Sequence, residues 1–327
     1  MIDAALIGLG GIAWKYDART QLKNSFALSQ AGAMLRHPNV RLVGGFSPNK
    51  TDREQFQTWS GLPAFDNLEA MLDKTQPKLI GVCSPTVNHF ENFLSAVDCG
   101  AQIIWLEKPA AASLTDACSM QDMAKEKSIT VGVNYFRRTL PAYQYCKSIL
   151  DTGRFGTCQL LQILYSPGLM RNGCHLVDQL FFLTGANDYE LLWLEKANDP
   201  DNPLFGLRLS TGHIAVVCGR DLPYHTNTIT MIFDQAILSM DKGGRKIHVE
   251  KSIPNPIAPG FYKLETDNTL FPEIGGIDGH MDYALANLLL AHQKKRQPAS
   301  NLTTALLTQR ILEEILKSHS VDRKSVV

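Results

Sequence analysis

Short apolar segments alternate with longer amphipathic ones in the N-terminal part of the chain. The apolar segments contain almost no polar positions, as is typical of strands that are covered on both faces. We predict strands at Ala4–Ile7, Val40–Phe46, Leu79–Cys83, Ile103–Leu106 and Ile129–Val133. The segments between them have helical spacing, as in Asn67–Lys74, His89–Cys99 and Leu114–Lys127. This alternation predicts an α/β domain with a doubly wound parallel sheet over residues 1–134.

Beyond residue 134, predicted strands follow one another without intervening helices. Turn residues at Thr211-Gly212 and Lys242-Gly243-Gly244 separate them, as in antiparallel hairpins. The predicted strands are Thr157–Tyr165, Tyr189–Lys196, Leu204–Ser210, Ile214–Gly219, Thr228–Phe233, Ala236–Met240 and Lys246–Lys251. A long loop over Pro254–Pro272 and helices at Asp282–Lys294 and Thr303–Ser318 complete the chain. We predict a second, α+β domain over residues 135–327, with a mainly antiparallel open sheet and helices.

Length and charge narrow the classes of function. A chain of 327 residues is long enough for about two domains. Basic and acidic residues balance at 32 each, so no global field would attract nucleic acid or an anionic membrane, and a small-molecule partner is expected. The seven cysteines include no C-x-x-C pair, which argues against a disulfide framework and a zinc site, and we propose no metal. With no signal-like N-terminus and no apolar run near ~20 residues, a cytoplasmic location is expected.

A glycine-rich turn follows the first predicted strand. In AALIGLGGIA, the positions of Gly8, Gly10 and Ala13 have the spacing G-x-G-x-x-[GA]. The first glycine permits a tight turn, the second lets a pyrophosphate approach the backbone, and the small third residue lets the next helix pack on the sheet. We predict a Rossmann-type dinucleotide site that includes Gly11 and Ile12 as well; a purely structural turn is the alternative.

The end of the second strand bears on the choice between NAD and NADP. Rossmann domains that prefer NAD usually place Asp or Glu there to hold the ribose hydroxyls. This chain has VGGFSPNK instead, so Ser47, Asn49 and Lys50 offer a hydroxyl, an amide and an ammonium group but no carboxylate. We predict that these residues bind the cofactor and that NADP is slightly favoured over NAD. An ordinary polar loop is the alternative.

Two charged residues end the fifth predicted strand, in the stretch IWLEKPAAA. The carboxyl ends of parallel strands face the crevice where ligands bind, so Glu107 and Lys108 lie where chemistry is expected. Pro109 biases Lys108 toward extended backbone angles, which keeps the lysine aimed outward. A lysine that merely extends its ammonium group into solvent is the structural alternative.

Four stretches resemble successive motifs of the glucose–fructose oxidoreductase/inositol dehydrogenase (Gfo/Idh/MocA) family: GLGGIA, CSPTVNHFENFLSAVDCGAQIIWLEKPAAASLTDA, VGVNYFRRTLPAYQYCKSILDTGRFG and NGCHLVDQLFFLTG. The resemblance spans essentially the whole chain. It implies a Rossmann domain and an antiparallel sheet that lines a substrate pocket and often builds dimers or tetramers. It also implies hydride transfer between a nicotinamide cofactor and a sugar, cyclitol or sugar nucleotide. By this analogy Lys108 reaches the reacting hydroxyl, and the cofactor is bordered by Ser84, Pro85, Thr86, His89, Glu107 and Lys108.

The stretch RNGCHLVDQLFFLTG predicts a helix that begins near Asn172 and ends at Gly185. Apolar residues form one stripe, and His175 and Asp178 are neighbours on the other side at i,i+3. A histidine on a polar helix face is usually just solvated. The resemblance implies instead that His175 is the acid/base that takes the alcohol proton, a task suited to a group titrating near pH ~6.5. We therefore take Lys108, His175 and Asp178 as the catalytic candidates.

The chain departs from the family pattern at Arg171, where classical members carry an aspartate. Arginine cannot accept a proton at physiological pH. Three explanations are open: Asp178 or Asn172 orients His175; Arg171 binds a phosphate or carboxylate of the substrate; or dehydrogenase activity is lost. We predict Lys108, Arg171, Asn172 and His175 as the substrate-binding residues, and we rank substrates that carry a phosphate or carboxylate first.

We therefore predict an NAD(P)-dependent dehydrogenase or reductase acting on CH–OH groups of a sugar-type substrate. One alternative is an NAD-dependent glycosidase on the same scaffold, and another is a non-catalytic NAD(P)-binding regulator. Arg137 and Arg138 also lie near the expected cleft, but we interpret them as a solvated pair before a helix.

Overall fold

The computed structural model describes residues 1–19, 26–195, 199, 201–267 and 277–321, and the side chains of this part as far as residue 318. The chain forms two compact units. Unit 1 is Met1–Thr139 with Asp278–Leu306, and unit 2 is Leu140–Ile277 with Leu307–Val327. No helix among the described residues is long and apolar enough to cross a membrane.

Unit 1 contains the predicted parallel sheet, with strand order β3-β2-β1-β4-β5-β6. Its strands are β1 (Ile2–Ile7), β2 (Val40–Phe46), β3 (Ala64–Phe65), β4 (Leu79–Val82), β5 (Ile103–Leu106) and β6 (Thr130–Val133). The chain builds outward from β1 in one direction to β3 and then returns to add β4, β5 and β6 on the other side. The order thus reverses between β1 and β4, the place where doubly wound sheets bind ligands at the carboxyl ends of their strands.

Helices separate these strands, as the alternating pattern predicted. They are α1 (Tyr16–Arg19), α2 (Gln30–Arg36), α3 (Lys50–Ser60), α4 (Leu68–Thr75), α5 (His89–Asp98) and α6 (Leu114–Glu126). Side-chain caps set several of their starts: Ser29, Asn49, Asn67 and Ser113 each accept a hydrogen bond from the backbone N–H three residues on. The helix boundaries therefore follow local capping chemistry.

One helix of unit 1 comes from far along the chain. Helix α9 (His280–Gln293) packs against β5, β6 and α2, with Leu285 and Leu288 buried in the same core as Trp105. Gly132 in β6 makes room for it, because a Cβ there would lie 3.1 Å from Leu288 Cδ1. Our boundary at residue 134 assigned this helix to the second domain, and the structure differs because the apolar face of α9 is complementary to a sheet distant in sequence.

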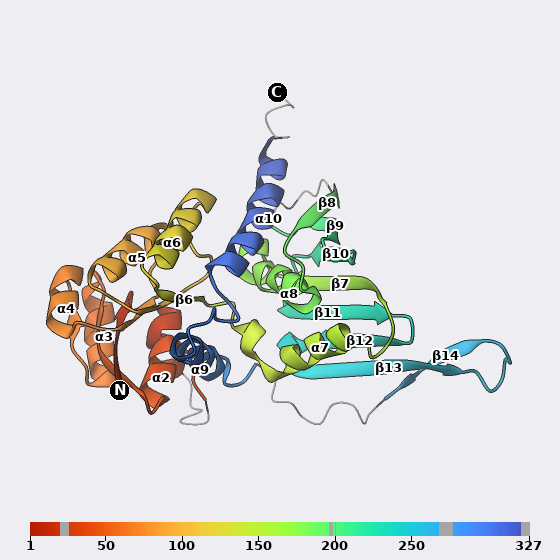
Figure 1. The fold of residues 1–327 in the computed structure, drawn as a ribbon, viewed down its shortest axis with the longest axis horizontal. Helices are drawn as coiled ribbons and strands as arrows, with labels where there is room; N and C mark the ends of the chain where they lie inside the picture. Colours follow the sequence, from red (N-terminus) through yellow and green to blue (C-terminus); the bar gives the residue numbers. More distant parts are fainter. Residues whose placement is uncertain (20–25, 196–198, 200, 268–276, 322–327) are drawn as a thin grey trace. The chain divides into compact units, whose positions relative to one another are not determined.

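Unit 2 is built on a mixed, mostly antiparallel sheet of order β14-β13-β12-β11-β7-β10-β9-β8 (Figure 1). Among the described strands of this sheet, β7 and β10 are the only neighbours that pair in parallel. The strands are β7 (Cys158–Ser166), β8 (Tyr189–Leu194), β9 (Leu204–Leu209), β10 (Ile214–Gly219), β11 (Thr226–Phe233), β12 (Ala236–Asp241), β13 (Lys246–Pro254) and β14 (Tyr262–Thr266). Helices α7 (Pro141–Thr152) and α8 (Cys174–Thr184) pack together, and α8 contacts β7. Helix α10 (Leu302–Val321) ends the described chain.

The fold class and the turns at Gly212 and Gly243-Gly244 are confirmed. The long loop predicted over Pro254–Pro272 is wrong in part, because it contains β14, which forms by pairing with β13 rather than by its own apolar pattern. The remainder of that loop, residues 268–276, and the last residue of the strand predicted at Tyr189–Lys196 lie outside the described residues.

Candidate active site

The glycine turn after β1 lies at the reversal point of the parallel sheet. Gly8 has a φ of +92°, and its N–H donates to the Phe46 carbonyl oxygen at 2.8 Å. A Cβ on Gly8 would lie 2.6 Å from the Ser84 amide nitrogen, so only glycine fits between β1 and the loop after β4. At Gly10, in contrast, no atom lies within 4 Å of an added Cβ. Open space at Gly10 is what the approach of a pyrophosphate requires, and the turn fits a dinucleotide.

The segment after the glycine turn differs from a regular helix. Gly11–Lys15 forms a π-helical turn that continues into the short α1. Ala13 is fully buried, as expected of the small residue that packs on the sheet. Trp14 Nε1 donates to the Leu9 carbonyl oxygen at 2.9 Å, which holds the turn in place.

The loop after β2 contains the residues predicted to read the ribose. Ser47 is buried, Asn49 caps α3, and Lys50 is exposed, with its Nζ 3.7 Å from Glu54 Oε1. The sequence interpretation missed Arg53, one helical turn further on. Its Nη1 donates to the carbonyl oxygens of Ser47 and Pro48, at 2.8 and 2.9 Å. Arg53 therefore organises this loop, and the only sequence signal for it was its i,i+4 spacing from Asn49.

His89 joins two loops at the carboxyl edge of the sheet. Its Nε2 lies 2.9 Å from the Ser84 carbonyl oxygen and its Nδ1 lies 3.0 Å from that of Pro109. The ring is buried, and burial lowers its pKa although the carbonyl contacts favour the protonated form. Ser84, Pro85 and Thr86 were predicted to border the cofactor together with His89. Ser84 Oγ accepts from Asn92 Nδ2 at 2.7 Å, Pro85 is exposed and Thr86 begins a 3₁₀ turn. His89 thus holds the loop after β4 to the loop after β5.

Glu107 is a buried carboxylate held by two amides. Its Oε1 accepts from Gln30 Nε2 at 2.9 Å and from Asn134 Nδ2 at 2.7 Å. Burial raises its pKa, while these two hydrogen bonds and the neighbouring Lys108 lower it to a smaller extent. Burial of the Cys83 thiol raises the pKa of that thiol, and the negative charge of Glu107 raises it further. Gln30 and Asn134 were not predicted, because they lie 77 and 27 residues from Glu107 in sequence.

Lys108 directly follows this carboxylate and is partly exposed. The Lys108–Pro109 peptide bond is cis, which the sequence interpretation did not foresee. Lys108 lies at the carboxyl edge of the parallel sheet. The glycine turn and the loop that contains Ser84 lie at the same edge.

Arg137 and Arg138 are buried, so their interpretation as a solvated pair is wrong. They belong to a 3₁₀ turn over Phe136–Thr139 that packs against α9, and this packing removes them from solvent. The Arg137 guanidinium lies over the Phe136 ring, 4.9 Å from its centroid. Within the described part of the chain, Arg137 Nε and Nη1 have no hydrogen-bond partner. A charged group with two uncommitted donors therefore lies just beyond Asn134.

In unit 2, α8 is preceded by a π-helical turn at Leu169–Gly173 and begins at Cys174, close to the predicted start. His175 is partly exposed, whereas Asp178 has no exposed surface. Asp178 Oδ1 accepts from Thr308 Oγ1 of α10 at 3.3 Å, and its Oδ2 accepts from Gln179 Nε2 at 3.2 Å. The predicted polar face is thus mostly buried, because α10 covers it.

Arg171 is exposed and lines a hollow of about 390 Å³. The other polar side chains of this hollow are Asp199, Asp201, Asn202 and Asp221. Asn172 donates from Nδ2 to the carbonyl oxygens of Ser166 and Pro167, at 3.2 and 2.9 Å, and so supports the turn with the second cis bond, Ser166–Pro167. The surroundings of Arg171 are acidic, which is unfavourable for an anionic ligand.

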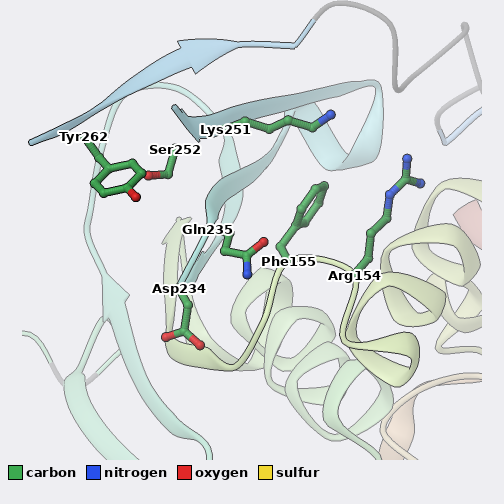
Figure 2. Close-up of a pocket in the computed structure, with 7 residues that line it drawn as sticks. All are labelled: Arg154, Phe155, Asp234, Gln235, Lys251, Ser252 and Tyr262. Atoms are coloured by element: carbon green, nitrogen blue, oxygen red, sulfur yellow. The ribbon is translucent and has the colours of Figure 1, made fainter. Parts of the chain in front are cut away.

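A hollow of about 580 Å³ lies elsewhere in unit 2, and Figure 2 shows its lining residues. They are Arg154, Phe155, Asp234, Gln235, Lys251, Ser252 and Tyr262. None of them was predicted as a site residue. Among the described residues, no three His, Cys, Asp or Glu side chains form a metal-ligand group.

Residues 2–135 match the family described as "Oxidoreductase family, NAD-binding Rossmann fold" (GFO_IDH_MocA). The match spans 134 of the 327 residues, so the part of the chain that is similar to this family is the one that forms the parallel sheet. The matched residues include β1, the glycine turn that follows it, and Glu107, Lys108 and Pro109, which are described above.

Two curated relatives come from Bacillus subtilis. Glucose-6-phosphate 3-dehydrogenase is 27% identical over 205 residues, 56% of this chain and 54% of the relative. scyllo-Inositol 2-dehydrogenase (NAD(+)) is 30% identical over 121 residues, 36% of this chain and 35% of the relative. The aligned segments thus span about half or less of these relatives.

Among solved structures, the fold is similar to that of the WlbA dehydrogenase from Bordetella pertussis, which was determined with NADH and UDP-GlcNAcA. The TM-score is 0.74 at 18% identity, over 98% of this chain and 96% of that one. Both units therefore have folds that are similar to those of that dehydrogenase.

Proposed function

We propose that the protein is an NAD(P)-dependent oxidoreductase that moves a hydride between the nicotinamide and a hydroxyl-bearing carbon of a sugar-type substrate. The observation that carries this proposal is the position of Lys108, which follows buried Glu107 at the sheet edge that also bears the glycine turn. Relatives that act on a sugar phosphate and on a cyclitol support the substrate class.

A nicotinamide cofactor, when bound, supplies the hydride chemistry, and the protein supplies binding and proton handling. We propose that Gly8, Gly10, Gly11, Ile12 and Ala13 cradle the pyrophosphate. In this proposal Glu107 and the Ser84–Thr86 loop border the nicotinamide side, and His89 keeps that loop attached to Pro109.

Lys108 is proposed to polarise the substrate hydroxyl, and His175 to take its proton during oxidation. An ammonium group favours the negative charge that develops on the hydroxyl oxygen as the proton leaves. Asp178 was predicted as a third catalytic residue. Its hydrogen bonds to Thr308 and Gln179 support a positioning role instead, through the orientation of α8.

For the cofactor, we propose a slight preference for NADP. The described loop after β2 offers Ser47, Asn49 and Lys50, and Arg53 adds a guanidinium that fixes the backbone of Ser47 and Pro48. Opposing this, the Lys50 ammonium group is paired with Glu54.

For the substrate, we propose that an anionic group, if present, binds at Arg137 rather than at Arg171. Arg137 is buried with two uncommitted donors, whereas Arg171 shares its hollow with three aspartates. A buried guanidinium group is a strong oxyanion partner because its N–H donors carry a positive charge. The seven cysteines are free thiols in the structure, which supports the proposal of a reducing, cytoplasmic location.

The test is NAD(P)H formation with matched pairs of neutral and anionic sugars, in wild type and in Lys108→Ala. We expect turnover with at least one sugar and a loss of about 10²–10⁴-fold in the variant, with cofactor affinity little changed. Lys125→Ala, an exposed lysine on α6, is the matched control and keeps wild-type turnover. Cofactor binding without turnover on any sugar would contradict the proposal and support a regulator.

A further inference from the structure

Lys15 and Asp52 form an ion pair between the segment after the glycine turn and helix α3. Lys15 ends the π-helical turn Gly11–Lys15, and Asp52 lies in the first turn of α3. The Lys15 ammonium group donates to Asp52 Oδ1, although the two residues are 37 positions apart in sequence. Their side chains are 21% and 24% exposed, so both charges are mostly covered. Salt screens such charges much less than fully exposed ones, so they act strongly on a group that binds beside them.

A series of hydrogen bonds places this ion pair beside the end of β2. Gly8, in the glycine turn, donates from its N–H to the last residue of β2. The next residue, Ser47, accepts at Oγ from the Asn49 N–H at 3.2 Å, and Asn49 Oδ1 accepts from the Asp52 N–H at 3.1 Å. The Asp52 carboxylate in turn binds Lys15, in the segment that follows the glycine turn. These contacts enclose the corner between the glycine turn and the loop after β2.

Aromatic packing fixes the two segments that carry the ion pair. The ring centroid of Trp14, the neighbour of Lys15, lies 6.0 Å from that of Phe56 and 5.4 Å from that of Trp59, and both partners are on α3. Trp14 and Phe56 are buried. Lys15 Nζ itself lies 5.9 Å from the Trp14 ring centroid. The ion pair is therefore preorganised, and binding of a ligand beside it does not have to order these segments.

Two other cations of the loop are more exposed or already committed. Lys50 is 80% exposed, and its ammonium group is paired with Glu54. Arg53 uses Nη1 for two backbone carbonyl oxygens of the loop. Lys15 and Asp52 thus provide one cation and one anion, both mostly covered, at the corner beside the glycine turn.

In Rossmann domains the adenosine ribose binds beyond the second strand, where a carboxylate holds the ribose hydroxyls of NAD or a basic residue accommodates the 2′-phosphate of NADP. The stretch VGGFSPNK supplies no carboxylate at the strand end. We propose that Asp52 and Lys15 recognise the 2′ position instead: Asp52 accepts from the hydroxyl of NAD, and Lys15 donates to the phosphate of NADP. Because the two charges offset each other, neither cofactor is strongly excluded. This inference rests on the proposed NAD(P)-dependent function.

Separate substitution of the two partners tests this assignment. Lys15→Met removes the cation and keeps the length of the side chain, and Asp52→Asn removes the anion and keeps its shape. Isothermal titration with each cofactor gives the ratio of the Kd of NADP to the Kd of NAD. We expect Lys15→Met to raise this ratio roughly three- to tenfold and Asp52→Asn to lower it by a similar factor. The double variant should return close to the wild-type ratio.

The opposite directions separate recognition from a structural role. Both single substitutions break the same ion pair, so a merely structural contact would change the two Kd values together and leave their ratio unchanged. Asp3→Asn is the matched control: Asp3 pairs with Arg41 near the start of β1, so the same change in net charge occurs at the opposite edge of the sheet and should not move the ratio.

The inference is overturned if the two single variants move the ratio in the same direction, if neither moves it, or if Asp3→Asn moves it as much as Asp52→Asn. In each of these cases both cofactors still bind, and the proposed function stands. Failure of the wild type to bind either dinucleotide would instead contradict the proposed function, and this inference with it.

Discussion

Gly8 and Ser84 belong to different loops, yet a Cβ on Gly8 would lie only 2.6 Å from the Ser84 amide nitrogen. Because the obstacle is backbone, no side-chain movement can relieve it. Gly8 also has a positive φ, so two independent constraints act on one residue.

Gly8→Ala is expected to destabilise the protein by about 1–3 kcal/mol more than Gly61→Ala and to weaken cofactor binding. Gly61 is the matched control, since it also has a positive φ but no atom lies within 4 Å of an added Cβ. Chemical unfolding and cofactor titration measure the two effects. Equal destabilisation by both substitutions would show that the close approach to Ser84 does not matter.

Glu107→Gln is expected to raise the stability of the cofactor-free protein at neutral pH. Burial raises the pKa of Glu107, so the folded state binds a proton more readily than the unfolded state, and stability falls as pH rises above the ordinary value of 4.5. Glutamine keeps the acceptor for Gln30 and Asn134 without the charge. The advantage of the variant in unfolding free energy should therefore shrink as pH falls toward 4.5 and be absent below that value. A constant difference across pH would be inconsistent with this account.

His89→Gln is expected to change how stability depends on pH. Burial lowers the pKa of His89, so the unfolded chain takes up a proton below the ordinary value of 6.5 while the folded protein resists it. The wild type therefore loses stability as pH falls below 6.5, and the variant lacks this component. Urea unfolding at several pH values measures the difference, and parallel curves for the two proteins would count against it.

His175 and Asp178 are expected to respond differently to substitution by asparagine. His175→Asn should lower kcat by about 10²–10⁴-fold with little change in Tm, as for the loss of a positioned base. Asp178→Asn should lower Tm, because a buried carboxylate that accepts from Thr308 and Gln179 is replaced by an amide that can accept from only one of them. If Asp178→Asn lowered kcat as much as His175→Asn at unchanged Tm, Asp178 would be catalytic after all.

Lys50 and Arg53 are expected to affect the two cofactors differently. Lys50→Ala should raise the Kd of NADP about two- to fivefold and leave that of NAD unchanged, as for an exposed charge partner. Arg53→Ala should weaken both cofactors, because its Nη1 fixes the carbonyl groups of Ser47 and Pro48. Isothermal titration with each cofactor checks this, and a loss confined to NADP in Arg53→Ala would mean that Arg53 contacts the phosphate directly.

Local patterns in the sequence predicted much of unit 1. The apolar segments, the helical spacing of Asn67–Lys74 and Leu114–Lys127 and the glycine turn depend on residues a few positions apart, so the parallel sheet and its carboxyl edge follow from short-range rules. The E-K-P tripeptide likewise located Glu107 and Lys108 at a strand end.

Long-range packing decided the rest. The amides of Gln30 and Asn134 reach Glu107, α9 packs against β6 over Gly132, and α10 covers Asp178, and each contact joins residues far apart in sequence. The burial of Arg137 and the pairing of β14 with β13 also result from long-range packing, because burial and strand pairing depend on which surfaces meet. The sequence by itself determined most of the strands and helices and the position of the glycine turn and Glu107-Lys108 at the carboxyl edge of the parallel sheet. Only the tertiary structure decided which polar groups are buried together, since the free energy of burying a charge depends on all of its neighbours in space.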